Sequence, residues 1–333
     1  MSSLKDVARL AGVSLSTASN ALNRKELVAE KTRNKVLSAA EKLNYKPNAV
    51  ARSLVTGNTR TVGLLIPDIS DPYFTEIAKG VDEYARAHDY SVILCNTGRD
   101  QVTEERYFRI LKEKRVDGII FTGGGRDNDR HLLQAEDSTS IVVVGRHNVS
   151  FTAVMVDNTR AATEVTNFLL DKGHNRIGFI AGTLSYTVSQ DRLKGYREAL
   201  FRKGIACDPM LIREEDFKAK GGHRAADFML NLPSERRPTA IICANDQMAI
   251  GAMGAIWGRG LQVPGDIAVI GFDDIPMASL TCPPLTTVRL PMYDMGYKAM
   301  ELVLKKISKR KEEEGMPEPQ IIFPYEIVIR GTV

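Results

Sequence analysis

The residues best suited to specific chemistry lie near the N-terminus, in a short segment rich in hydroxyl and amide side chains. Ser16, Ser19, Asn20 and Asn23 recur there at helical spacing, and Leu15 lies beside them. Hydroxyl groups bind phosphates, the Asn amide can bond to adenine at two atoms, and leucine can touch a thymine methyl. An outward face of this composition, with no ion pairs, is typical of a helix that reads the major groove of DNA.

Two short helices and a tight turn are expected to position this face. Leu4, Val7 and Ala8 fit one side of a first helix. Gly12 should end that helix because glycine tolerates positive φ. Ser14 is then placed to cap a second helix through its hydroxyl. On this segment alone, an ordinary helical hairpin at a domain edge remains an alternative.

The remaining apolar positions predict a small three-helix domain. Ala18, Ala21 and Leu22 form the inward stripe of the second helix. A third helix over residues 31–44 places apolar side chains at helical spacing, and Tyr45 should close the core. The apolar residues of this third helix are Val36, Leu37, Ala40 and Leu43.

The charge of the chain is unevenly distributed. Residues 1–60 contain eleven Lys and Arg against four carboxylates, whereas residues 61–333 contain 34 basic and 37 acidic residues. A basic head on a mildly acidic body indicates a polyanionic partner for the head, although a basic segment can also be a solvated face. Residues 1–46 are therefore predicted to form a DNA-binding head.

Residues 47–60 are predicted to connect the head to the rest of the chain. The stretch from Asn48 to Val55 has helical composition but is too short to be stable alone. Arg52 offers a cation for phosphates, and Leu54 offers an apolar wedge for a minor-groove base step. A passive linker is the alternative interpretation.

From Thr61 onward, buried apolar runs alternate with amphipathic helices. This pattern predicts parallel sheets covered on both faces, and the length of residues 61–333 favours two similar lobes with a cleft between them. The predicted strands cover residues 61–67, 91–96, 117–122, 140–145, 176–182, 239–244 and 267–272. The predicted helices cover residues 73–88, 102–115, 159–172, 189–203, 221–231, 246–259 and 292–309.

Polar and aromatic side chains follow several of these strands. Ligands of open α/β sheets bind beyond the carboxyl ends of the strands, so these side chains are candidates for binding a polyhydroxylated or heterocyclic small molecule. Strand-end turns or helix caps would also explain individual members, and Asp157 and Asp246 are expected to be such caps. The candidates are Asp71, Tyr73, Phe74, Arg146, Tyr186, Arg192, Phe217, Asn245 and Asp273.

Four motifs together closely resemble the LacI/GalR family, which contains the lactose and purine repressors. They are VARLAGVSLSTASNALN, TRNKVLSAAEKLNYKPNAVARSL, VGLLIPDISDPYF and IGFDD, and they cover essentially the whole chain in the family's order. The resemblance implies a helix-turn-helix head, a hinge helix that folds on DNA, and a two-lobed α/β body similar to type I periplasmic binding proteins. It also implies a cytoplasmic homodimer that binds a palindromic double-stranded operator and a sugar-like effector.

The resemblance also assigns roles to individual residues. Leu15, Ser16 and Asn20 fall on base-reading positions, Thr17 and Ser19 on phosphate-contacting ones, and Leu54 on the minor-groove lever. Further expected DNA contacts are Ser14, Asn23, Ala51 and Arg52. Tyr73, Phe74, Arg192, Phe217, Asn245 and Asp273 fall on effector-contacting positions.

The chain departs from the family at two informative positions. Asn20 stands where many relatives have arginine, so the resemblance does not determine which operator base is read at that position. Tyr186 stands where the purine repressor has an effector-binding arginine, which argues against a purine. The chain ends at Val333 without a heptad tail, so a dimer is expected rather than a tetramer.

Two other classes of protein compete with this interpretation. An enzyme on a nucleotide-binding fold is prompted by FTGGGR at residues 121–126, but these glycines have neither dinucleotide-binding spacing nor a P-loop lysine. A transport binding protein would fit the body alone, but the basic head and the lack of an apolar leader argue against it. No cofactor, metal site or membrane segment is expected. Cys95, Cys207, Cys243 and Cys282 are expected to be buried, reduced thiols.

Overall fold

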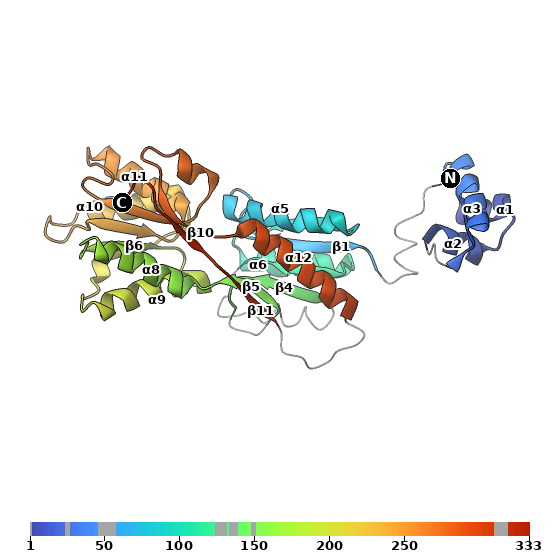
Figure 1. Cartoon of the computed structure of the whole chain (residues 1–333), viewed down its shortest axis with the longest axis horizontal. Coiled ribbons are helices and arrows are strands. Elements are labelled where there is room, and N and C mark those ends of the chain that lie inside the picture. Colours follow the sequence, from blue (N-terminus) through green and yellow to red (C-terminus); the bar gives the residue numbers. More distant parts are fainter. Residues whose placement is uncertain are drawn as a thin grey trace. The chain divides into compact units, whose positions relative to one another are not determined.

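The computed structural model describes residues 2–23, 27–45, 58–123, 132, 139–147, 151–309 and 319–333. The chain divides into two compact units, Met1–Arg60 and Thr61–Val333, which are called here the head and the body (Figure 1).

Three helices form the described part of the head: α1 (Leu4–Ala11), α2 (Leu15–Asn23) and α3 (Glu30–Lys42). The Ser3 hydroxyl accepts a hydrogen bond from the Asp6 backbone N–H, and the Asp6 carboxylate accepts one from the Ser3 N–H. This reciprocal capping box starts α1. Gly12 ends α1 with a φ of 66° in the left-handed region, as its position in the sequence predicted.

The head core is built from one face of each helix. Its buried side chains are Val7, Ala8, Ala18, Ala21, Val36, Ala39 and Ala40. Tyr45 packs against this cluster, as expected. The prediction that Leu37 joins the core was wrong: its side chain is 41% exposed, and Ala39 takes an inward position instead. Leu37 directly follows the buried Val36, so the helical period turns its side chain outward.

Two six-stranded sheets organise the body. The first has the order β11-β5-β4-β3-β1-β2 and the second the order β12-β10-β9-β8-β6-β7. All pairings are parallel except that between β10 and β12. The strands of the first sheet are β1 (Thr61–Ile66), β2 (Ser91–Asn96), β3 (Gly118–Phe121), β4 (Ser140–Val144), β5 (Ala153–Val156) and β11 (Gln320–Phe323). Those of the second are β6 (Ile177–Ala181), β7 (Ile212–Glu214), β8 (Ala240–Cys243), β9 (Ala268–Asp273), β10 (Thr286–Arg289) and β12 (Glu326–Val328).

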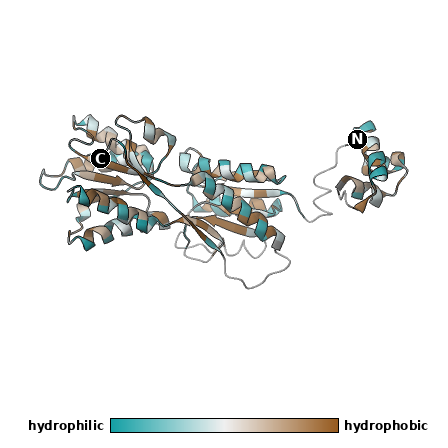
Figure 2. Cartoon of the chain, viewed as in Figure 1, coloured by the Kyte–Doolittle hydropathy of each residue, from teal (hydrophilic) through white to brown (hydrophobic). Residues whose placement is uncertain are grey.

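Helices cover the faces of each sheet and complete two lobes (Figure 1). The first lobe contains α5 (Pro72–Ala87), α6 (Gln101–Glu113) and α12 (Met292–Lys309). The second contains α8 (Asn158–Asp171), α9 (Thr187–Arg202), α10 (Ala219–Leu230) and α11 (Asp246–Gly258), with two 3₁₀ turns, Pro209–Leu211 and Pro276–Leu280. In Figure 2 most strands are hydrophobic while the helices mix both characters, as expected for sheets buried between amphipathic helices.

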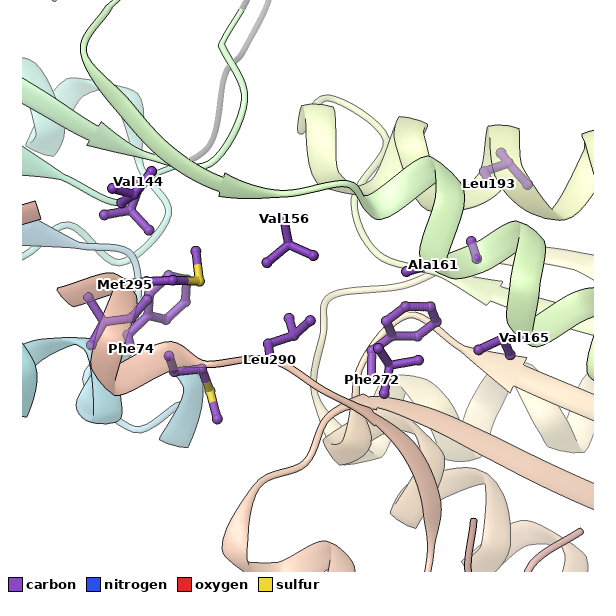
Figure 3. Packing of buried hydrophobic residues seen from close by; sticks show 14 of the residues in the cluster. Phe74, Val144, Val156, Ala161, Val165, Leu193, Phe272, Leu290 and Met295 are labelled. Carbon is purple, nitrogen blue, oxygen red and sulfur yellow. The ribbon is translucent and has the colours of Figure 1, made fainter. Parts of the chain in front are cut away.

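The chain crosses between the lobes three times. The crossings lie between β5 and α8, between β10 and α12, and between β11 and β12. Val156 and Leu290 lie on the first two crossings and are buried between the two lobes' apolar side chains (Figure 3).

All seven predicted helices and all seven predicted strands of the body are present with boundaries shifted by at most two residues. Five further strands were missed: β5, β7, β10, β11 and β12. The cysteines are free, but the expectation that all are buried was wrong, since Cys207 is half-buried and Cys282 exposed. No described helix is long and apolar enough to cross a membrane.

Candidate functional site

The start of α2 is held by hydroxyl groups. The Ser14 Oγ accepts a hydrogen bond from the Thr17 backbone N–H at 3.0 Å, so Ser14 caps the helix as predicted. The same oxygen lies 2.8 Å from both the Ser16 Oγ and the Thr17 Oγ1. This network fixes the first turn of α2, whose free N–H groups and positive dipole end suit an anion such as phosphate.

The outward face of α2 is open to solvent. Leu15 is 46% exposed, Ser16 is exposed, and Ser19 and Asn20 are half-buried, whereas Ala18 and Ala21 are buried. Leu15, Ser16 and Asn20 therefore lie outside the buried core of the head and are at least partly open to solvent. Asn23 ends α2, but its side chain lies outside the described residues, as do Ala51, Arg52 and Leu54.

All nine candidate ligand-binding residues of the body line one cavity between the lobes. It encloses about 780 Å³ of empty space, solvent at its mouth included. Asp71, Tyr73, Phe74 and Arg146 come from the first lobe, and the other candidates come from the second: Tyr186, Arg192, Phe217, Asn245 and Asp273. The rule that ligands bind beyond strand ends thus selected side chains that the fold brings together, although Asp71 and Asp273 are 202 residues apart in the sequence.

Arg192 is a buried arginine that contacts four other residues of the second lobe. It is 4% exposed; its Nε donates to the Asn158 Oδ1 at 2.9 Å and its Nη1 donates to the Ala244 carbonyl oxygen. Its Nη2 lies 3.6 Å from the Asp273 Oδ1, and its guanidinium lies over the Phe272 ring. Burial raises the pKa of Asp273 well above its ordinary value, and the neighbouring Arg192 opposes that shift.

Asn245 and Asp246 lie at the start of α11, where the cap is Asn245 and not Asp246 as expected. The Asn245 Oδ1 accepts from the Met248 N–H at 2.9 Å, so Asn245 is the cap of α11, and its Nδ2 donates to the Phe217 carbonyl. Asp246 is the first residue of the helix instead of its cap. It is fully buried, and its carboxylate accepts from the Thr287 hydroxyl and the Ile275 N–H. Burial raises its pKa to about 7.

Three of the eight described non-glycine residues with positive φ line the cavity. Arg99, Phe217 and Asp273 line it, and all three have positive φ values, 63°, 64° and 109°. Such conformations are uncommon for residues other than glycine and cluster at functional sites. A Cβ on Gly182 would lie 2.0 Å from the Phe217 Cζ, so the ring occupies its place because residue 182 has no side chain.

The first lobe contributes a carboxylate beside an arginine. The Arg99 Nη2 lies 3.4 Å from the Asp71 Oδ2, and the Arg99 guanidinium lies over the rings of Phe74 and Phe217. The Asp71 Oδ1 accepts from the Tyr73 N–H at 3.1 Å and caps α5. Burial raises the pKa of Asp71, while that hydrogen bond and Arg99 oppose the shift.

The predicted set lacked five polar residues of the cavity: Arg99, Thr122, Asn158, Thr187 and Asp191. Arg99 follows β2 by three residues, so the strand-end rule would have found it. Asn158 and Asp191 are positioned by Arg192 and Arg146, partners that only the fold brings near. Among the described residues no cluster of His, Cys, Asp and Glu suits a metal ion.

The head and the body thus combine a helix-turn-helix with a two-lobed α/β binding fold. Residues 3–48 match the family model for bacterial regulatory proteins of the lacI family. Residues 59–326 match the model for periplasmic binding proteins and the sugar-binding domain of the LacI family. The chain belongs to the LacI family of transcriptional regulators.

Named relatives cover nearly the whole chain. It is 38% identical to the transcriptional regulator RegA of Clostridium saccharobutylicum over 99% of this chain and 98% of that protein. It is also 38% identical to the transcriptional repressor PurR of Vibrio campbellii, over 100% and 99%.

Solved structures of the family are similar along the whole chain. The lac repressor dimer bound to operator and the anti-inducer ONPF is 30% identical, with a TM-score of 0.86 over 99% of this chain and 98% of that one. The complex of the regulator CelR with cellobiose is 29% identical, with a TM-score of 0.74 over the full length of both chains.

Proposed function

We propose that this protein is a transcriptional repressor whose affinity for a palindromic operator is controlled by a sugar-like molecule bound between its two lobes. The observation that carries the proposal is the coexistence, in one chain, of a solvent-accessible hydrogen-bonding face on α2 and a polar and aromatic cavity between the lobes of the body.

The head supports DNA binding through its shape and charge. Leu15, Ser16 and Asn20 of α2 lie outside the buried core of the head, and the capped N-terminus of that helix suits a phosphate. The excess of basic residues in residues 1–60 favours a polyanion. The lac repressor, which this chain resembles over its whole length, was solved with operator bound.

The cavity supports a polyhydroxylated ligand. Carboxylates, amides and guanidinium groups can fix hydroxyls, and the rings of Tyr73, Phe74, Tyr186 and Phe217 can cover an apolar sugar face. We propose that Arg192 and Asp273 hold the ligand from the second lobe while Tyr73 and Phe74 cover it from the first. The CelR neighbour carries cellobiose, which is consistent with this class of ligand.

Dimerisation and the hinge complete the proposal. Two heads are needed to read both halves of a palindrome, so we propose a homodimer, the form in which the lac repressor neighbour was solved. Residues 47–60 are proposed as the hinge, with Leu54 as its minor-groove wedge.

The proposal is tested by selection from a randomised duplex library with the full chain, followed by shift assays in 50 and 200 mM salt. A palindromic consensus and a steep loss of affinity with salt are expected. Recovery of random sequences only would contradict a sequence-specific regulator.

Asn20 provides a sharper version of this test. Its amide presents a donor and an acceptor side by side, which match adenine, whereas arginine presents two donors to guanine. Asn20→Arg should therefore change one base of each half-site from adenine to guanine, a discrimination of about 1–3 kcal/mol. An unchanged consensus would leave base reading to Leu15 and Ser16.

A panel of sugars, sugar phosphates and nucleobases in a thermal-shift assay tests the body independently. A ligand at 100 times its Kd should stabilise the body by about 2.7 kcal/mol. Stabilisation by nucleobases alone would contradict the assignment of a sugar.

A further inference from the structure

Ion pairs of the described residues join the two lobes directly at two places. Lys218 of the second lobe lies 3.8 Å from Asp68 of the first, and a closer pair lies at the cavity wall. Arg146 follows β4 in the first lobe, and Asp191 lies in α9 of the second. The Arg146 Nε donates to the Asp191 Oδ2 and its Nη2 donates to the Asp191 Oδ1, both at 2.8 Å. This two-point geometry is the strongest arrangement available to an arginine and a carboxylate.

The backbone of Arg146 is held by the same helix. The Thr187 Oγ1 donates to the Arg146 carbonyl oxygen at 2.6 Å. Thr187 is the first residue of α9 and Asp191 lies one turn later, so both contacts come from one side of the helix. The first turn of α9 therefore binds the end of the neighbouring lobe's strand through both main chain and side chain.

The other Arg–Asp pairs of the cavity do not cross between the lobes. Arg99 and Asp71 both belong to the first lobe, and Arg192 and Asp273 both belong to the second. Those pairs can shape a wall of the cavity but cannot hold the lobes together. The Arg146–Asp191 pair can, because its two partners separate when the cleft opens.

The pair also borders two hollows. Arg146 and Asp191 line the inner cavity, and with Asp157, Gln190 and Lys194 they line a second, more open hollow. The Arg146 side chain is 41% exposed and that of Asp191 15% exposed. The interaction is therefore partly shielded from water, which makes it stronger than a fully exposed pair but still sensitive to salt.

We propose that Arg146 and Asp191 form a latch that sets the balance between closed and open clefts before any ligand binds. No ligand group is needed to complete the pair, so the chain supplies part of its own closure energy. A ligand that requires the closed cleft then binds with an affinity scaled by the closed fraction. This regulatory consequence depends on the proposed function, whereas the latch itself does not.

The latch can be measured without DNA or ligand. Spin labels are placed on cysteines introduced at the exposed Arg86 of α5 and Arg202 of α9, in a full chain with Cys207 and Cys282 changed to serine. Double electron–electron resonance then reports the distance between the lobes. The compared chains are the labelled parent, Asp191→Asn, Arg146→Asp, and the charge-reversed pair Arg146→Asp with Asp191→Arg.

The structure offers a matched control. Arg236 and Asp208 also form a two-point pair: the Arg236 Nε donates to the Asp208 Oδ2 at 3.2 Å and its Nη2 donates to the Oδ1 at 2.9 Å, with side chains 47% and 29% exposed. Both residues belong to the second lobe, so Asp208→Asn removes a similar pair without touching the cleft. Circular dichroism of every variant checks that the body is folded.

We expect Asp191→Asn and Arg146→Asp to shift the open-to-closed ratio toward open by about fivefold. The charge-reversed pair should recover part of the closed population, and Asp208→Asn should match the parent. Identical distance distributions in all folded variants would overturn the proposal, as would equal opening in Asp208→Asn. Because the measurement omits DNA, failure of the latch leaves the proposed operator binding untouched, and the converse also holds.

Discussion

The outward face of α2 and the cavity of the body are built in opposite ways. Leu15, Ser16 and Asn20 lie within six consecutive residues, are uncharged, and are at least partly open to solvent. The cavity gathers side chains from both lobes, and its charged members Arg192 and Asp273 are almost fully buried. A local, exposed site can change its specificity at little cost in stability, whereas a buried site couples binding to folding.

Replacing Arg192 should lower the stability of the protein far more than replacing a residue on the outward face of α2. Arg192→Met leaves Asp273 buried without its cation and frees the Asn158 and Ala244 oxygens. The free energy of unfolding of the body should fall by about 3–5 kcal/mol. Urea denaturation followed by Trp257, the single tryptophan and part of α11, measures it.

Two substitutions at positions at least partly open to solvent serve as controls for Arg192→Met. They are Asn20→Ala in the head and Arg160→Met on the exposed side of α8. Each should change the Trp257 transition by less than about 0.5 kcal/mol. Equal midpoints for Arg192→Met and Arg160→Met would remove the distinction between buried and exposed sites.

One carboxylate in each unit, Asp246 in the body and Asp6 in the head, should contribute to the pH dependence of stability with opposite signs. Burial raises the pKa of Asp246 to about 7 in the folded body. Between its unfolded value near 4 and pH 7, the folded body binds more protons than the unfolded chain, so stability falls as pH rises. In the head, hydrogen bonds from Ser3 lower the pKa of Asp6, so that contribution is lost as pH falls through the acidic range.

Asp246→Asn removes the titrating carboxyl group while it keeps the shape of the side chain, so this variant isolates the contribution of Asp246 to the pH dependence of stability. Urea denaturation at pH 5 and pH 7, followed by Trp257, should give a flatter pH dependence in the variant. The two slopes should differ by at most about 1.4 kcal/mol per pH unit. Equal slopes in the two proteins would show that Asp246 is ionised throughout this range and would contradict the prediction.

The smallest expected effect on stability comes from replacing one glycine in each unit, Gly12 in the head and Gly258 in the body. Gly12 has a φ of 66° and no atom within 4 Å of an added Cβ, so Gly12→Ala should cost about 1 kcal/mol through backbone strain alone. Gly258 ends α11 with equally open surroundings and no positive φ, so Gly258→Ala should be neutral or slightly stabilising.

Hydrogen exchange of the full chain measures both substitutions locally. Peptides covering residues 4–23 should exchange about fivefold faster in Gly12→Ala, and those covering residues 246–258 should not exchange faster in Gly258→Ala. Unchanged exchange in Gly12→Ala would show that the turn adapts to a side chain.

The sequence predicted the elements whose periodicity is strong. The helices of the head and body, and strands such as β4 and β9 that are buried on both faces, carry uninterrupted apolar patterns. The missed strands are only three or four residues long, and β11 and β12 lie at sheet edges where some positions face solvent. Short edge strands carry too few side chains to establish a period.

The sequence predicted nine of the residues that line the candidate cavity, but it did not predict which of them contact one another. The strand-end rule located Arg192, Asp273 and Arg146, because it depends on chain order alone. It could not say that Arg192 contacts Asn158 or that Arg146 contacts Asp191, since those pairs are 34 and 45 residues apart. Such contacts depend on how elements distant in the sequence pack together, which no local pattern encodes.

The three crossings between the lobes also govern how the body can assemble on the ribosome. The first lobe begins at Thr61, yet its helix α12 and edge strand β11 are translated only after all of the second lobe except β12. At about 5–20 residues per second, the ribosome needs roughly 10–30 s between Val156 and Phe323. During that interval the nascent first lobe exposes the apolar surface that α12 will cover, so this protein should depend on chaperones until its last residues emerge.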